Sequence, residues 1–262
     1  MFRRLSTVLL CTLALVMPAG MAQAAPAKPV ITTPRQMAEV VEGDVLHIRV
    51  RIPAAKSARK ATLESFDKST YSPFAGWEPV KSVAVRGRKK LTFKITAQHE
   101  NTKRFRVRIE TKAGRSKPSK PVAIKVWRWI PLREFSPYQQ TSGTGTGEGS
   151  IAGRRYAAWG GFTYSSARSW ESRYTPGRNC KMFRGLAGLA DTSADGTSGA
   201  VTLSADEQPL WTSPVLTPGV AYPFEVALNL PYRMSLAAAN TSAPELRAYP
   251  LIGNPELLCT GI

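Results

Sequence analysis

Apolar and polar residues alternate in short segments along most of this chain. In residues 45–52 every second residue is Leu, Ile or Val, and the residues between them include two arginines and a histidine. Such alternation predicts a strand with one face in a core and the other in water. Because the pattern recurs at close spacing, residues 25–127 are predicted to form a β-sandwich. The repeats are residues 61–66, 90–95, 104–110 and 122–127.

The second half of the chain shows alternation interrupted by turns. An apolar segment from Cys180 to Asp191 is followed by a turn at residues 193–199, by alternation in residues 200–204 and by a second turn at residues 205–208. Glycine and Asp-Gly in such turns are typical of antiparallel hairpins. The predicted fold class is therefore all-β, with two sandwiches in tandem.

Charge separates the two halves. Residues 26–134 contain 25 Lys or Arg and 9 Asp or Glu, a net charge of +16, whereas residues 135–262 contain 9 of each kind. Because residues 130–135 have strand character, we place the boundary between residues 127 and 128. A Gly- and Thr-rich run at 141–150 is predicted to be a flexible surface loop of the second domain. It lacks the Gly-Lys-Ser/Thr ending of a phosphate-binding loop.

The first 24 residues have the features of a secretory signal peptide. A basic head at Arg3 and Arg4 precedes an apolar run of about a dozen residues and a small-residue exit at 22–24. This run is shorter than the roughly 20 apolar residues that a membrane-spanning helix needs. We therefore expect a secreted mature protein, with no later segment that crosses a membrane.

Cleavage there would remove Cys11 and leave Cys180 and Cys259. An even pair of cysteines in an exported chain predicts a disulfide. The alternatives are a metal pair and a nucleophilic thiol. Both are disfavoured, because no histidine follows His99 to act as a ligand or a base.

Residues 133–262 resemble the NPCBM-type carbohydrate-binding module. The resemblance rests on the Phe and Gly-Leu-x-Asp of residues 180–191, on Ile151–Tyr156, and on the strands expected at 216–230 and 233–238. It implies a jelly-roll, galactose-binding-like sandwich that binds sugars in loops at one end and is not itself an enzyme. Residues 157–164 depart from the family pattern, because they contain no histidine. This departure concerns the ligand more than the fold.

Residues 28–127 are similar in strand pattern to the immunoglobulin-like or fibronectin III-like domains of secreted bacterial proteins. No diagnostic motif supports this resemblance. It implies an immunoglobulin-like β-sandwich.

The stretch from Tyr156 to Tyr174 contains six aromatic residues in nineteen. Sugar rings pack on aromatic planes, and a few polar groups bind the hydroxyls. Most of these rings are expected in the core, since Trp and Tyr bury well and alternate strand positions point inward. Trp159 and Trp170 are favoured as ligand contacts because they lie nearest the expected loops. The candidate sugar-binding residues are Trp159, Tyr164, Arg168, Trp170 and Tyr174.

Clustered cations in the first domain suggest a surface for anionic polymers. The alternative is a solvated face that keeps the sandwich soluble. No nucleic-acid-binding motif is found, so wall polymers and acidic polysaccharides are the expected partners. The candidate patch contains Arg86, Arg88, Lys89, Lys90, Lys103, Arg104, Arg106 and Arg108.

Acidic residues give little support to a metal site or to catalysis. Asp191, Asp195, Asp206 and Glu207 could supply calcium ligands, but Asp also favours turns and the turn interpretation is preferred. No pair of carboxylates stands out as the acid and base of a glycosidase. No cofactor and no metal are expected.

Together these patterns favour a secreted, non-catalytic, glycan-binding protein. Its first domain would attract anionic polymers, and its second would bind polysaccharide. A structural or protein-adhesive surface protein is the main alternative, and a polysaccharide hydrolase or hydrolase accessory is the second.

Overall fold

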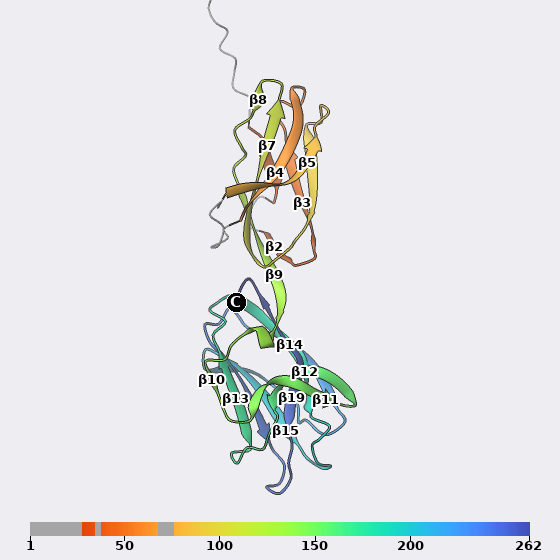
Figure 1. Cartoon of the computed structure of the whole chain (residues 1–262), viewed down its shortest axis with the longest axis vertical. Coiled ribbons are helices and arrows are strands. Elements are labelled where there is room, and N and C mark those ends of the chain that lie inside the picture. Colours follow the sequence, from red (N-terminus) through yellow and green to blue (C-terminus); the bar gives the residue numbers. More distant parts are fainter. Residues whose placement is uncertain (1–27, 35–37, 68–75) are drawn as a thin grey trace, which may run out of the picture.

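The structure, a computed structural model, describes residues 28–34, 38–67 and 76–262 (Figure 1). These residues form strands and one short 3-10 helix, so the predicted all-β class is confirmed. Within them, no helix has the length and apolar character needed to cross a membrane. The predicted signal peptide, residues 1–24, lies outside the described residues.

The first domain packs two sheets against each other. Leu63 of the larger sheet and Ile48 and Phe93 of the smaller sheet are fully buried in one shared core. The smaller sheet has the order β1–β3–β6, with β1 (Val30–Thr33), β3 (Val45–Arg51) and β6 (Lys90–Thr96). The larger sheet contains β2 (Ala38–Val41), β4 (Ala58–Asp67), β5 (Gly76–Ala84), β7 (Asn101–Thr111), β8 (Gly114–Arg115) and β9 (Val122–Pro131).

The second domain is also a two-sheet sandwich and follows the 3-10 helix η1 (Leu132–Glu134). Phe183, Leu236 and Leu257, from both sheets, are fully buried in its core. One sheet has the order β10–β13–β18–β15–β16, with β10 (Gln139–Gln140), β13 (Ser169–Tyr174), β15 (Gly199–Ala205), β16 (Gln208–Thr212) and β18 (Met234–Asn240). The other contains β11 (Thr144–Ile151), β12 (Arg154–Gly161), β14 (Cys180–Leu189), β17 (Ala221–Ala227) and β19 (Pro250–Cys259).

The hairpin predicted after residue 204 is present. Asp206 and Glu207 join β15 to β16 with φ angles of 44° and 69°. Two successive left-handed residues match the twist of an antiparallel hairpin, and Asp tolerates this conformation well. The turn signal in the sequence therefore had a local structural cause.

The Gly- and Thr-rich run is a strand, so the prediction of a flexible loop at 141–150 was wrong. Strand β11 pairs with β12 from Thr144 opposite Gly161 to Ile151 opposite Arg154. Its glycines leave room for neighbours: a Cβ at Gly149 would lie 2.6 Å from Leu251 Cδ1. Glycine here permits close packing of the strand, which composition alone does not distinguish from flexibility.

Strand β9 belongs to both domains. Its residues 122–126 pair with β7, and residues 38–41 of β2 run parallel to it, while Arg128–Pro131 pair with β19 of the second domain. The predicted boundary between residues 127 and 128 therefore falls inside a continuous strand. Figure 1 shows this strand running from one sandwich into the next.

Side chains also join the domains around β9. Lys181 Nζ of β14 lies 3.0 Å from Glu39 Oε2 of β2 and 4.1 Å from the centre of the buried Trp127 ring. The hydrogen bond from Lys181 and its attraction lower the pKa of the Glu39 carboxyl. A shared strand and these contacts fix the two domains relative to each other.

Cys180 and Cys259 form a disulfide, as predicted. The two residues are register partners at the ends of β14 and β19, with their Cα atoms 4.0 Å apart. The bond closes a loop across 79 positions of sequence, which is almost the whole domain from β14 onward.

Candidate functional site

Three of the predicted sugar-binding residues are in the core, so their assignment to a ligand was wrong. Trp159, Trp170 and Tyr174 are 0%, 2% and 1% exposed. Trp159 Nε1 donates a hydrogen bond to Ser172 Oγ at 3.0 Å, and Trp170 Nε1 donates to the Thr163 carbonyl at 3.0 Å. Burial also raises the pKa of the Tyr174 hydroxyl to about 12. Rings at these depths cannot stack on a sugar.

Arg168 is committed to holding a loop. Its Nη2 donates to Asn240 Oδ1 at 3.0 Å and to the Ala243 carbonyl at 3.1 Å, and it also hydrogen-bonds the Ser242 carbonyl. Its backbone is left-handed, with φ of 55°. The side chain thus fixes the β18–β19 loop against the β12–β13 loop, which makes it a positioning residue.

Tyr164 is the predicted candidate that remains on the surface, with 60% of its side chain exposed. The guanidinium of Arg247, from the β18–β19 loop, lies 5.1 Å from the centre of its ring. Both residues line a hollow of about 190 Å³ together with Glu245 and Tyr249. An aromatic ring, a cation and a carboxylate therefore meet at the end of the domain that is remote from the first domain.

A second hollow, of about 410 Å³, lies beside the first and shares Tyr249 with it. Phe162, Arg155 and Asp191 also line this second hollow. Asp191 Oδ2 accepts a hydrogen bond from the Gly153 amide at 3.0 Å, which holds the β14–β15 loop beside the β11–β12 turn. We call these two hollows and their lining residues the loop-end site.

The loop-end site is built from segments that are distant in sequence. The centre of the Trp170 ring lies 6.1 Å from the centre of the Tyr249 ring. Ser193 Oγ accepts a hydrogen bond from the Tyr249 amide at 3.0 Å. Arg247 and Tyr249 are not among the residues predicted from the sequence. A signal was present, since Arg247-Ala-Tyr249 follows a turn-rich segment just before the last strand.

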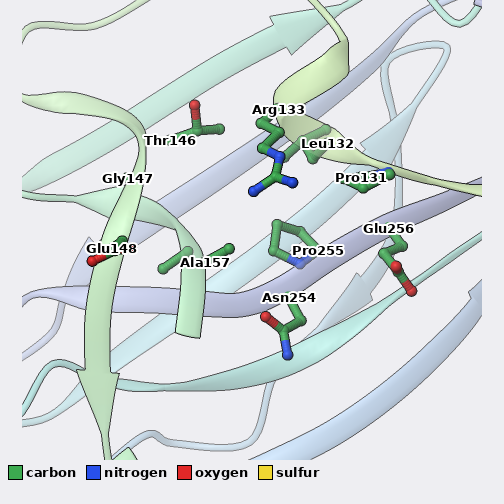
Figure 2. Close-up of a pocket in the computed structure, with 11 residues that line it drawn as sticks. Pro131, Leu132, Arg133, Thr146, Gly147, Glu148, Ala157, Asn254, Pro255 and Glu256 are labelled. Atoms are coloured by element: carbon green, nitrogen blue, oxygen red, sulfur yellow. The ribbon is translucent and has the colours of Figure 1, made fainter. Parts of the chain in front are cut away.

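A third hollow, a cleft of about 530 Å³ that shares Glu148 with the second, lies where β12 and β9 diverge along the same edge of β19 (Figure 2). Asn254, which has φ of 45°, and Pro255 lie at the point of divergence. Figure 2 shows the Arg133 side chain extending from η1 over this space, toward Asn254 and Pro255. We call it the fork cleft.

The two carboxylates of the fork cleft are already paired. Glu256 Oε2 lies 2.7 Å from Arg184 Nη2, and Arg184 in turn stacks 3.9 Å from the centre of the Trp129 ring. Glu148 forms an ion pair with Arg155. The polar groups left to meet a ligand here are those of Arg133, Asn254 and Thr146.

The predicted anionic-polymer patch is divided between the two sheets of the first domain. Arg86, Arg88 and Lys89 lie in the turn before β6, and Lys90 begins that strand. Lys103, Arg104, Arg106 and Arg108 lie on β7 of the other sheet. Clustering in sequence therefore did not produce one surface.

Several cations of this predicted patch are neutralised or tied down. Glu64 binds Arg106 Nε at 2.6 Å and Arg108 Nε at 3.1 Å. The Arg106 guanidinium also lies 4.2 Å from the centre of the Trp77 ring. Arg88 Nη2 donates to the Ala84 carbonyl at 2.8 Å.

Two of the acidic turn residues, Asp191 and Asp206, accept hydrogen bonds from backbone amides. Asp206 Oδ1 accepts from the amides of Tyr232 and Arg233 at 3.0 and 2.9 Å. Across residues 28–34, 38–67 and 76–262, no group of three or more His, Cys, Asp or Glu side chains is arranged to hold a metal ion.

No protein family and no curated protein matches this sequence. Among solved structures, the CBM51-2 and INT domains of Clostridium perfringens ZmpB, in complex with GlcNAc, align with 63% of this chain at 11% identity and a TM-score of 0.40. The alignment covers 39% of that structure's chain, which is less than half its length. CBM51 from C. perfringens GH95, in complex with methyl-galactose, aligns with 49% of this chain and 99% of its own, at 14% identity and a TM-score of 0.39. Fibronectin(III)-like modules of Clostridium thermocellum CbhA align with 38% of this chain and 94% of their own, at 16% identity and a TM-score of 0.29.

Proposed function

We propose that this chain is a secreted, non-catalytic glycan-binding protein whose second domain binds polysaccharide at the loop-end site. The observation that carries the proposal is the exposed Tyr164 ring, held by Arg247 beside two hollows that share Tyr249. A sugar needs an aromatic plane for its apolar face and fixed polar groups for its hydroxyls. The sequence resemblance to NPCBM-type modules also supports a sugar-binding site in loops at one end of the sandwich.

The two hollows favour an oligosaccharide over a single sugar. One ring would lie on Tyr164, with Arg247 and Glu245 in reach of its hydroxyls, and the next would lie beyond Tyr249, near Asp191. The loops carrying these residues are fixed by Arg168 and by the hydrogen bond from Trp170 Nε1. A site that is already ordered loses little conformational entropy on binding.

A glycan array with the full chain, followed by titration of the sugars retained, tests this proposal. GlcNAc and methyl-galactose, named for the similar structures, are the first soluble probes. Tyr164→Ala and Arg247→Ala should each weaken binding by about tenfold, the effect of losing one stacking or charged contact.

Tyr232→Ala is the matched control, because Tyr232 is also an exposed tyrosine, at 50%. It lies near the disulfide end of the domain, where its carbonyl accepts a hydrogen bond from the Gly177 amide. This variant should bind as the unsubstituted chain does. Retained binding in Tyr164→Ala together with loss in Arg133→Ala would move the site to the fork cleft. Absence of sugar binding with capture of a protein partner would favour the adhesive alternative, and turnover of a polysaccharide would favour the hydrolase.

We further propose that the first domain attracts anionic polymers such as those of a cell wall. Its net charge of +16 over residues 26–134 supports this proposal, because such a field raises the local concentration of polyanions. Binding by charge alone should weaken steeply with salt. An affinity that stays constant between low and high salt would contradict it.

A further inference from the structure

The outer face of the β1–β3–β6 sheet carries a regular array of cations. In β3 the residues from Val45 to Arg51 alternate between exposed and buried, and β6 does the same over residues 90–94. Arg51 lies opposite Lys90, and His47 lies opposite Lys94, in the antiparallel register. We call this surface the cation face; it contains His47, Arg49, Arg51, Lys90 and Lys94.

None of the acidic side chains that the structure describes neutralises the cation face. Within the described residues, none of its lysines and arginines forms an ion pair, whereas Arg106, Arg108 and Arg128 elsewhere in the domain are paired with glutamates. The undescribed segments 1–27, 35–37 and 68–75 contain no Asp or Glu in their sequence. These segments therefore hold no carboxylate side chain for the face.

Lys81 adds a fifth lysine or arginine at the edge of the array. Lys81 of β5 donates a hydrogen bond from Nζ to the Lys94 carbonyl at 2.9 Å, which places its ammonium beside β6. Residues two apart on one strand are about 6.7 Å apart, and adjacent strands are about 4.8 Å apart. The result is a two-dimensional array of positive charge with a spacing set by the backbone.

Such an array is unfavourable for the isolated fold. Like charges placed directly opposite each other destabilise an antiparallel pair. An anionic chain lying across β3 and β6 would reverse the sign of these interactions. The exposed residues between the cations are Thr92, Thr96, Val45 and Val30, so the described part of this surface offers charge and hydroxyls but no phenyl, phenol or indole ring.

We propose that the cation face binds an acidic polysaccharide chain, and this inference rests on the proposed attraction of the first domain for anionic polymers. Single-stranded nucleic acids are bound largely by stacking of bases on aromatic side chains, which this face does not provide. A polysaccharide with one acidic group on each repeat needs only a row of cations at fixed spacing. The second domain, proposed to bind sugar, would then engage neutral parts of the same kind of polymer.

The test compares two fourfold variants of the full chain with equal net charge. The face variant is R49Q/R51Q/K90Q/K94Q. The control is K112Q/R115Q/K117Q/K120Q, whose four cations are exposed in the segment around β8. Binding is measured against polygalacturonate and a sulfated polysaccharide, which separate carboxylate from sulfate, and against single-stranded DNA.

The face variant should lose at least about tenfold in affinity for the acidic polysaccharides at low salt, and its slope of log K against log salt should flatten by about 3. The control should stay within about twofold of the unsubstituted chain. R49K/R51K, which keeps the charge, should retain binding. Folding of each variant is checked by its circular dichroism spectrum.

Each other result overturns a different statement. Equal losses in both fourfold variants would overturn the cation face as a site and leave a general attraction by net charge. No binding of the unsubstituted chain to either polysaccharide would overturn the proposed attraction itself. Binding of DNA in preference to both polysaccharides would overturn the acidic polysaccharide as occupant.

Discussion

The cation face and the loop-end site present ligand groups in opposite ways. The cation face is a pleated sheet surface, where the backbone repeats one side-chain position at constant spacing. At the loop-end site, three separate connections bring Tyr164, Asp191 and Arg247 together in one irregular surface. A sheet face can therefore match the charge of a repeating polymer, whereas loops can match the shape of particular sugars.

The scaffolds of the two surfaces differ as well. The first domain contains no cysteine, so its two sheets are held together without a disulfide. It is also strongly basic, with 25 Lys or Arg against 9 Asp or Glu over residues 26–134. The second has balanced charge and a disulfide between its β14 and β19. The loops of the loop-end site therefore extend from a sandwich that a disulfide closes, whereas the cation face belongs to a sandwich without a disulfide.

The disulfide gives the largest predicted effect. In the double variant Cys180→Ser/Cys259→Ser, the second domain should lose about 4 kcal/mol of unfolding free energy, because a long loop is no longer closed in the unfolded chain. Chemical denaturation followed by Trp fluorescence measures this loss. The first domain is the internal control. If it lost as much unfolding free energy as the second, the two domains would unfold together, and this would contradict the proposed difference in how they are stabilised.

Removing the hydrogen bonds by which Arg168 fixes the β18–β19 loop should have the next largest effect. Arg168→Met keeps the aliphatic stem but deletes the donors to Asn240, Ser242 and Ala243. We expect a loss of about 2 kcal/mol, since hydrogen bonds from a charged donor are involved. Hydrogen exchange should accelerate in the β18–β19 loop. Unchanged exchange there would contradict the positioning role.

Glu64→Gln tests the difference between the two outer faces of the first domain. Without this carboxylate Arg106 and Arg108 lose their counterion, so stability should fall by about 1 kcal/mol. At the same time the affinity for polyanions should rise by about twofold or more, because two cations are freed. Glu78→Gln, at an exposed position of β5, is the control with equal charge. An increase as large in the control would assign the gain to net charge alone.

The pairing of Glu39 with Lys181 gives the smallest predicted effect and a pH dependence. The pKa of Glu39 is lowered from 4.5 in the folded protein, so the pair stabilises at pH values above the usual carboxyl range and is lost as pH falls through the folded pKa. Both side chains are partly exposed, and we expect Glu39→Gln to cost about 0.5 kcal/mol at pH 7 and less at pH 3. Thermal unfolding at both pH values measures this, and an equal cost at the two would show that the ion pair does not contribute.

The sequence predicted the strands well, since alternation between core and water is a local property. It also predicted the disulfide, because only two cysteines follow residue 24. It did not predict which aromatic rings face solvent. Trp159 and Tyr164 are close in sequence, but the first lies on a strand facing the core and the second lies in the following loop. That difference depends on where β12 ends, which the sequence pattern does not define.

Other features depend on contacts between distant segments. The glycines of β11 are typical of a loop, and their role became apparent only from the close approach of Leu251. The basic patch was predicted from neighbours in sequence, yet the cation face arises from the pairing of β3 with β6, whose residues Arg51 and Lys90 are far apart along the chain. Arg247 and Tyr249 reach the loop-end site through the same kind of long-range packing.

The strand shared by the two sandwiches has a consequence for bivalent binding. Because β9 continues from one sheet into the other, the span between the cation face and the loop-end site does not vary as it would across a flexible linker. A polymer long enough to bridge this span would meet its second surface at a high effective concentration, and a shorter fragment would gain nothing from it. The protein would then select polymers by their length, because the shared strand sets the distance between its two binding surfaces.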